Sequence, residues 1–232
     1  MDALLRRRQM MADGGTPPLP YTPVDYIVAD GTAYINTNIA GTPAKSMELK
    51  ALTISSQSNS GLLGSMGSST DGEGKKFIMA QIAYFSSDTS KHIVGAYYYL
   101  ISSGSPSVAD SVANGTPFVI RTSFKKSAQS IGVKQEGESS YTAVTKIYSS
   151  TVSSTLKMFL LALNNNGTAA SVAESGTRLY YCKIYSDATY STLVFDGVPC
   201  YYNGEYGIWD KVTDSFFGNV AGSGAFSGPS NS

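Results

Sequence analysis

The stretch PFVIRTSF, residues 117–124, decides the fold class, because apolar and polar side chains alternate along it. Phe118 and Ile120 fall on one face of an extended chain, and Arg121 and Ser123 fall on the other. A period of two residues is typical of a half-buried β-strand and does not match the 3.6-residue period of an amphipathic helix. The stretch therefore predicts a strand with one face in a core and the other toward solvent.

The same alternation occurs in KSMELKAL, residues 45–52, where Met47 and Leu49 oppose Glu48 and Lys50. Further strands are expected in stretches rich in aromatic and branched residues, at 76–85, 92–101, 141–148 and 156–163. Clusters of Gly, Ser, Asn and Pro separate these stretches, and no helical pattern intervenes. Short strands spaced in this way predict an all-β domain built as a two-sheet antiparallel sandwich.

The composition indicates a folded domain and argues against nucleic-acid and membrane partners. The 232 residues are 42% hydrophobic and 15% charged, which is enough apolar material for a core and argues against intrinsic disorder. Seventeen basic and 17 acidic residues balance, so we expect no nucleic-acid partner. No apolar run reaches membrane-spanning length, and the N-terminal apolar residues are interrupted by arginines, so we expect neither a membrane span nor a signal peptide.

Cysteine and histidine are scarce, which bears on disulfides and metals. Cys182 and Cys200 are the only cysteines, and we favour two buried thiols over a bond between neighbouring strands. The single histidine, His92, excludes a His-rich zinc site. Asp71 and Glu73 fall short of the six to eight oxygens that calcium takes. No metal and no cofactor is expected.

No set of catalytic residues emerges, so we expect no enzymatic activity. The glycine-rich GLLGSMG, residues 61–67, lies in a β region and opens no helix, which disfavours a phosphate site. Glycoside hydrolysis needs two facing carboxylates. Glu136 and Glu138 fall at a hairpin tip, whereas Glu205 and Asp210 point to opposite faces of one strand. His92 is expected to be an ordinary polar residue at a strand start, because it is followed by an apolar run.

Consecutive tyrosines are the candidate binding residues. Side chains alternate along a strand, so runs such as YYY at 97–99 must place some rings outside the core. We take Tyr97, Tyr99, Tyr201 and Tyr202 as candidate contacts for a glycan or a partner protein. The alternative is that they are scattered surface residues without a binding role.

The stretch RLYYCKIY, residues 178–185, is expected to be a strand. Strict alternation places Tyr180, Cys182 and Ile184 in the core, with the intervening residues, Leu179 and Tyr181 among them, on the outer face. Near the C-terminus, YGIWDKVTDSFFGN is expected to form a short hairpin that closes the sandwich and turns at residues 212–214, with its tryptophan packed on the sheet.

The N-terminal 23 residues are expected to be an arm and a tether. Residues 2–12 favour a short helix, and four prolines between residues 17 and 23 stiffen the segment that follows. Apolar and basic side chains in the arm provide docking contacts for another protein: Leu4, Leu5, Arg6, Arg7, Arg8, Met10 and Met11. A solvated chain end without function is the alternative.

Three segments of the domain resemble one family. DYIVADGTAYINTNI, residues 25–39, resembles the "YI-x-S-x-G-T-Q-YIDTGI" opening of concanavalin A-like jelly-roll domains, which are common in phages and prophages of gut Bacteroides and its relatives. Residues 158–187 are similar to the family's "LFA-x-N-N-x-G … ARLYSCKIYD" segment. Residues 192–229 are similar to its "LVRDFIPC … GVIGLYDKVNGKFYTNAGTGTFTAG" close.

The resemblance implies a jelly roll over residues 24–228, between the arm of residues 1–23 and a tail of residues 229–232. It supplies no catalytic residues. It implies a non-enzymatic structural or accessory protein of a phage virion, such as a capsid decoration, head fibre or tail module, made in the host cytoplasm. Residues 1–20 would dock on other virion proteins, and a homo-oligomer, for example a trimer, is expected. The alternative is a lectin-like module that recognises host surface glycans.

Overall fold

A computed structural model describes residues 19–41, 46–54, 60–68, 75–83, 90–100, 107–125, 128–146 and 154–229. The described residues form eighteen β-strands and no helix, which confirms the all-β prediction. Residues 1–18 of the N-terminal arm and tether lie outside these ranges, and with them the seven candidate docking residues. No helix among the described residues is long and apolar enough to cross a membrane.

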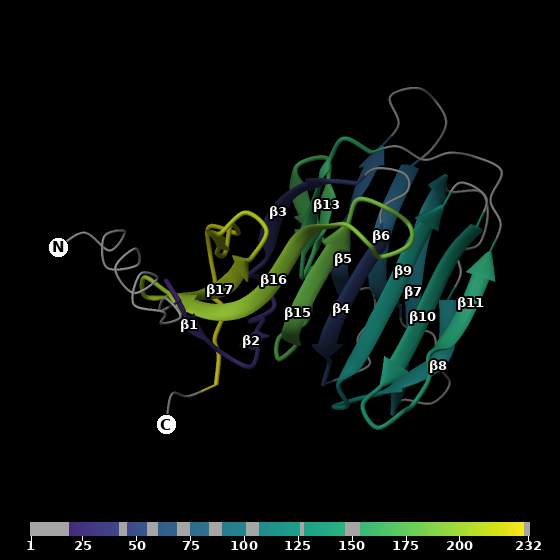
Figure 1. The fold of residues 1–232 in the computed structure, drawn as a ribbon, viewed down its shortest axis with the longest axis horizontal. Coiled ribbons are helices and arrows are strands. Elements are labelled where there is room, and N and C mark those ends of the chain that lie inside the picture. Colours follow the sequence, from purple (N-terminus) through teal and green to yellow (C-terminus); the bar gives the residue numbers. More distant parts are fainter. Residues whose placement is uncertain are drawn as a thin grey trace, which may run out of the picture.

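The first sheet holds ten strands, and its main path runs β11-β10-β9-β4-β15-β16-β17-β18 (Figure 1). Two short strands extend it, since β1 pairs with β16 and β2 pairs with β15. The bounds are β1 Thr22–Pro23, β2 Ile27–Val28, β4 Ser46–Leu52, β9 Phe118–Lys125, β10 Ala128–Gln135, β11 Thr142–Lys146, β15 Arg178–Tyr185, β16 Leu193–Tyr202, β17 Glu205–Asp210 and β18 Ser215–Phe217.

The second sheet holds eight strands in the order β14-β13-β5-β6-β7-β8, and β12 joins β5 to β3. The pairings are antiparallel except for that of β13 with β5. The bounds are β3 Ile35–Ala40, β5 Ser60–Ser68, β6 Lys75–Ala83, β7 Lys91–Leu100, β8 Ser107–Ala113, β12 Lys157–Leu160, β13 Leu163–Asn165 and β14 Thr168–Ala170.

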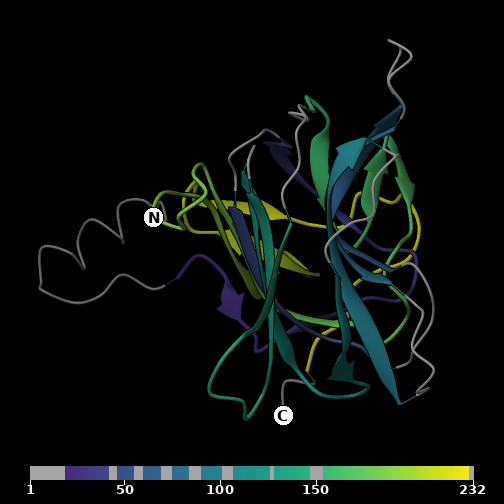
Figure 2. The same cartoon turned by 90° about the vertical axis from the view of Figure 1, so that its right-hand side faces the viewer.

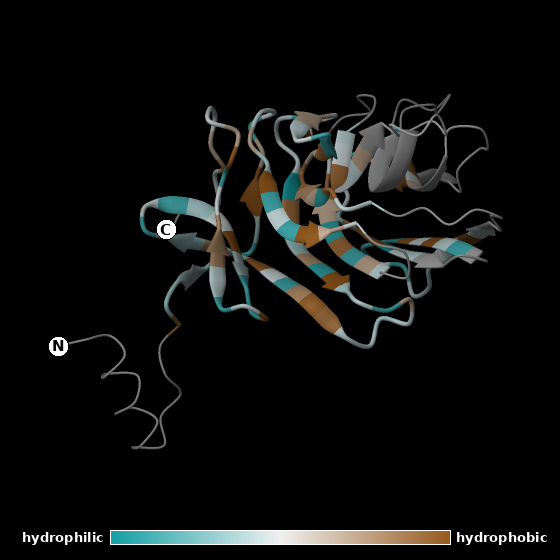
Figure 3. Cartoon of the chain, turned by 90° about the horizontal axis from the view of Figure 1, so that it is seen from above, coloured by the Kyte–Doolittle hydropathy of each residue, from teal (hydrophilic) through white to brown (hydrophobic). Residues whose placement is uncertain are grey.

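The two sheets face each other as the layers of a jelly-roll sandwich (Figure 2). Bands of hydrophobic brown and hydrophilic teal alternate along the strands (Figure 3), as the period of two predicts. Phe118, Ile120, Met47 and Leu49 are fully buried in one core cluster, whereas Arg121 is exposed on the other face of its strand. The burial of apolar side chains between the layers is the main stabilising term of the fold.

The prediction for β15 was partly wrong because the strand contains a β-bulge. The pairing with β4 shifts register between Leu179 and Tyr181, which leaves Tyr180 as an extra residue. Leu179, Cys182 and Ile184 are therefore all buried in the core. Tyr180 is half-buried and contacts Lys50 on the outer face. Both adjacent tyrosines thus lie outside the core.

The strand expected at 156–163 is also interrupted. Leu161 has a φ of 64°, in the left-handed region that an L-residue adopts at a cost, and it separates β12 from β13. Its backbone is held from two sides, because its N–H donates to the carbonyl of Leu62 and its carbonyl accepts from the N–H of Ala173. Local alternation gives no sign of such a break, since every residue from 158 to 163 is buried.

The C-terminal hairpin has the predicted turn. Residues 211–214 connect β17 to β18, and the buried carboxylate of Asp210 accepts hydrogen bonds from the N–H groups of Val212 and Thr213. Trp209 is 6% exposed, and its Nε1–H donates to Asp214. The hairpin is thus fixed by local turn chemistry and by packing of the indole.

The two thiols are free and buried, as we favoured. Burial raises the pKa of both thiols, that of Cys200 to about 12. A thiol with a raised pKa is a poor nucleophile at neutral pH. Both cysteines therefore act as core residues.

Candidate functional site

Tyr201 and Tyr202, two of the predicted contact residues, pack within the protein at the end of the first sheet. Tyr201 lies 4.9 Å from Tyr206 between ring centroids, and Tyr202 lies 5.4 Å from Trp209. Tyr21 stacks on the same indole at 4.8 Å, where β1 joins the sheet. The two tyrosines are half-buried in this cluster, so much of their ring surface contacts other rings of the chain.

Tyr97 and Tyr99 lie on β7 in the second sheet, and their side chains are outside the described part of the chain. The tyrosine pair on β16 belongs to the first sheet. The two pairs of predicted tyrosines therefore belong to strands of different sheets.

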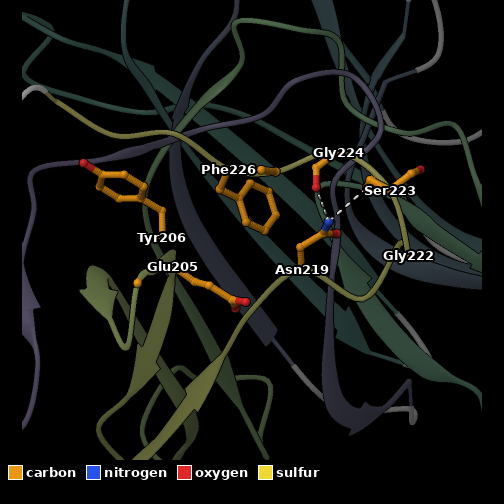
Figure 4. Close-up of a pocket in the computed structure, with 9 residues that line it drawn as sticks. Glu205, Tyr206, Asn219, Gly222, Ser223, Gly224 and Phe226 are labelled. Atoms are coloured by element: carbon orange, nitrogen blue, oxygen red, sulfur yellow. Dashed lines mark hydrogen bonds between the residues drawn. The ribbon is translucent and has the colours of Figure 1, made fainter.

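A shallow pocket lies beside the C-terminal loop (Figure 4). Its volume is about 250 Å³, just below the range typical of small-molecule sites. Asn219 lines it, and its amide donates to the carbonyls of Ser223 and Gly224 at 3.0 and 3.1 Å. Glu205 is the one carboxylate among its lining residues, which gives this pocket no facing acid pair. The polar groups of the pocket mainly hold the loop.

A second candidate lies on the outer face of the first sheet, where β15, β4, β9 and β10 run side by side (Figure 1). Glu48 of β4 is directly opposite Arg121 of β9 on one side and Lys183 of β15 on the other. Directly opposed residues on one face of a sheet have side chains within reach of each other. We call the group of Glu48, Arg121, Lys134, Tyr141, Tyr181 and Tyr190 the Arg121 patch.

Glu48 is the buried centre of the patch. One carboxylate oxygen accepts a short hydrogen bond from Nε of Arg121, and the other accepts from the hydroxyl of Tyr181 at 2.9 Å. Burial by itself would lower the pKa of Arg121, but the hydrogen bond and charge of Glu48 outweigh it and raise that pKa. Burial, followed by the charge of Glu48, raises the pKa of Tyr181. Both partners therefore keep their protons at neutral pH and hold the carboxylate.

The first ring beside Arg121 lies over a glycine of the neighbouring strand. Gly132 of β10 lies directly opposite Arg121, and a Cβ at this position would contact the Tyr141 side chain at 3.4 Å. Tyr141 lies above Gly132, and its ring centroid is 4.9 Å from the guanidinium carbon of Arg121. The ammonium of Lys134 lies 5.3 Å from the same ring. Two cations therefore share one aromatic ring.

The loop between β15 and β16 supplies the second ring, Tyr190. The carboxylate of Asp187 accepts N–H groups of Thr189, Ser191 and Thr192, and the resulting hydrogen bonds, first that of the Thr189 hydroxyl, lower its pKa. Loop carbonyls accept from two strand hydroxyls: Ser46 donates to Asp187 and Ser123 donates to Ala188. Tyr190, with a φ of 59°, lies 5.7 Å from the guanidinium carbon of Arg121. The loop is thus held over β4 and β9.

Comparisons with known proteins bear on the fold. No protein-family model matches the chain, and no curated protein matches its sequence. The enzymatically active domain of tailspike protein 2 from bacteriophage CBA120 has a TM-score of 0.50 at 12% identity, over 71% of this chain and 28% of that chain. The CBM40 of the Ruminococcus gnavus IT-sialidase has a TM-score of 0.48 at 12% identity, over 71% and 91%.

A further similar structure is an SAP-like pentraxin from Limulus polyphemus, with a TM-score of 0.43 at 11% identity over 74% of this chain and 73% of that one. At such identities a likeness shows the fold alone. The match to the tailspike domain supports the jelly-roll architecture and shows that a phage protein has a similar fold. It covers just over a quarter of that protein's chain.

The Arg121 patch combines features of a binding site. It offers aromatic rings, a planar cation and a fixed loop, which suit stacking and hydrogen bonding to a polar ligand. No group of three or more His, Cys, Asp or Glu among the described residues could hold a metal ion. The sequence had assigned Glu48, Arg121 and Tyr181 to outer strand faces, but it gave no sign that these strands are neighbours.

His92 is buried at the start of β7. It is 1% exposed, and its Nδ1 lies 3.0 Å from the side-chain oxygen of Asn114 while its Nε2 lies 3.2 Å from the hydroxyl of Thr53. A neutral ring that donates from Nδ1 and accepts at Nε2 satisfies both contacts. Burial lowers the pKa of His92 below its usual 6.5. The residue is therefore a neutral core histidine.

We expect the fold to lose stability as the pH falls from 7 to 5.5. Below 6.5 the unfolded chain binds a proton on His92 that the folded chain does not bind, so unfolding becomes easier by up to about 1.4 kcal/mol per pH unit. Urea unfolding at 0.5-unit pH steps measures the slope. Since His92 is the only histidine, the His92→Gln variant should flatten the slope in this window. An unchanged slope in that variant would contradict the assignment.

Proposed function

We propose that the protein is a non-enzymatic module of a phage virion whose jelly roll binds carbohydrate through the outer face of the first sheet. The observation that carries this proposal is the Arg121 patch. Tyr141 and Tyr190 flank a guanidinium that is fixed by the buried Glu48. Sugar rings have apolar faces that stack on aromatic side chains and hydroxyl groups that pair with charged groups, so such a patch fits a saccharide.

The carbohydrate proposal is tested by saturation-transfer NMR with a panel of neutral and acidic bacterial capsular oligosaccharides. We expect transfer to at least one oligosaccharide and at least a fivefold loss of affinity in Tyr141→Leu, because the stacking ring is removed. Tyr26→Leu is the matched control, since Tyr26 is also half-buried and has a cation, Arg178, 4.5 Å from its ring, outside the patch. Absence of binding across the panel, or release of reducing sugars from it, contradicts the proposal.

The virion part of the proposal assigns the N-terminal arm to docking on another particle protein. Contacts within the domain fix the point where the chain enters it. Tyr21 stacks on Trp209 and β1 pairs with β16, so the chain is held by the domain from Tyr21 onward. The described chain thus joins the first sheet at its β17 end, where β1 pairs with β16, whereas β9, β10 and β11 lie toward the other end (Figure 1). Docking by the arm would therefore leave the Arg121 patch accessible.

Deleting residues 1–16 should leave a folded domain that no longer joins particles. The deletion spares Tyr21 and its stacking on Trp209, so thermal unfolding of the truncated domain should be unchanged. Incorporation is measured by immunodetection in particles purified by density gradient. Replacing Arg6, Arg7 and Arg8 by Gln at full length tests the basic contacts separately. Normal incorporation of the truncated chain contradicts the docking role.

A further inference from the structure

We infer that the Arg121 patch selects acidic saccharides, with a ligand carboxylate bound by the free edge of the Arg121 guanidinium. This inference rests on the proposed carbohydrate-binding function and adds the class of ligand. It is carried by the hydrogen-bonding state of Arg121, by the charges around it and by the rigidity of the flanking rings.

Arg121 has an unused hydrogen-bonding edge. Its side chain is 46% exposed, and its Nε donates to Glu48. In the described part of the chain, neither of its two terminal nitrogens has a hydrogen-bond acceptor. Four N–H groups of a planar fork therefore remain, and such a fork matches the two oxygens of a carboxylate. The orientation of this fork is fixed because Glu48 holds the Nε side.

The charges around Tyr141 also favour an anion. Arg121 and Lys134 both lie close to this ring, and the carboxylate among them, Glu48, has both oxygens engaged. Lys183 adds no excess charge, because Asp196 lies directly opposite it on β16. A neutral sugar offers the guanidinium fork only uncharged hydroxyl oxygens, whereas an acidic sugar supplies a charged, bidentate acceptor while its ring stacks on a tyrosine.

The flanking rings are held in place before a ligand arrives. Tyr190 belongs to a loop fixed by the Asp187 turn and by hydrogen bonds to Ser46 and Ser123, and Tyr141 occupies the space above Gly132. A site whose side chains are already ordered loses less conformational entropy on binding. The two rings lie close to the guanidinium of Arg121, so a ligand bound there contacts them as well.

The experiment compares each of three acidic ligands with its carboxyl methyl ester, which removes the negative charge: tetragalacturonate, a hyaluronan tetrasaccharide and a sialylated trisaccharide. Affinities of the full chain are measured by NMR titration. We expect at least one acid to bind about tenfold more tightly than its ester, because the ester removes a charge-assisted pair. Arg121→Lys should remove this preference while keeping a positive charge for Glu48. Arg178→Lys is the matched control outside the patch.

The outcomes separate this inference from the proposed function. If acid and ester bind equally and Tyr141→Leu weakens both, carbohydrate binding stands and the acidic preference fails. If no saccharide of either kind binds, both fail. If an acidic peptide such as tetraglutamate binds at the patch and no saccharide does, the ligand class is wrong. A preference for the acid that persists in folded Arg121→Lys also overturns the inference. Thermal unfolding of each variant checks that it is folded.

Discussion

Arg121→Ala is expected to destabilise the protein by about 3 kcal/mol, whereas Glu48→Gln should cost only about 1 kcal/mol. The two side chains form one ion pair, but they differ in exposure, at 46% for Arg121 and 9% for Glu48. Loss of the arginine leaves a buried carboxylate with one remaining donor, the hydroxyl of Tyr181. Loss of the carboxylate leaves a guanidinium that water can reach. The cost of breaking this pair should therefore depend on which partner is removed.

Urea unfolding of the two single variants and of the double variant tests this asymmetry. The double variant should be more stable than Arg121→Ala alone, because it no longer buries an unpaired charge. Arg178→Ala serves as a control for loss of an arginine side chain that lies over a tyrosine ring elsewhere. Equal costs for the two single variants would show that Glu48 is well solvated and that the pair behaves as a surface salt bridge.

Gly207→Ala is expected to cost about 2–3 kcal/mol, because the added methyl group has no space. A Cβ at this position would lie 2.5 Å from the carbonyl oxygen of Phe217 and 2.7 Å from the ring of Phe216. The carbonyl belongs to β18, which is held to β17 by the pairing of Ile208 with Phe217. The hairpin that closes the sandwich would have to shift as a unit to accommodate the methyl group.

Gly132→Ala is the matched control for this prediction. Its Cβ would meet the Tyr141 side chain at 3.4 Å, an ordinary van der Waals contact, so we expect a cost below about 1 kcal/mol. Both variants add one methyl group to a strand of the first sheet. Unfolding midpoints in urea should separate them, and coincident midpoints would mean that the closing hairpin adapts to the extra atom.

Among the strands that the sequence did not predict, β8 and β10 were missed because their alternation is weak. SVADSVA of β8 and AQSIGVKQ of β10 are rich in small or polar residues. The core positions Ile131 and Val133 of β10 are buried, but two branched apolar residues in eight do not make a clear pattern. The bulge at Tyr180 was missed for a different reason. A bulge is an extra residue relative to a partner strand, so it does not exist until β4 is placed beside β15.

The exposure of the candidate tyrosines could be predicted only in part from the sequence around them. Runs of tyrosine correctly implied that some rings lie outside the core, since Tyr201 and Tyr202 are only half-buried. They are nevertheless covered by Trp209, Phe216 and Tyr206, which lie on strands that follow them in the same sheet. The exposure of a tyrosine ring therefore depends on the neighbouring strand as much as on the strand that carries the ring.

The sequence by itself determined the all-β class and, for most side chains, the face of the strand on which they lie. Alternation of apolar and polar residues is a property of each extended segment alone. It placed Glu48, Arg121 and Tyr181 on outer faces. Only the tertiary structure decided that they meet, since Arg121 is 73 residues and Tyr181 is 133 residues from Glu48. Strand order and register arise from the packing of the whole core, so a patch assembled across β15, β4, β9 and β10 has no signature in any one stretch of the chain.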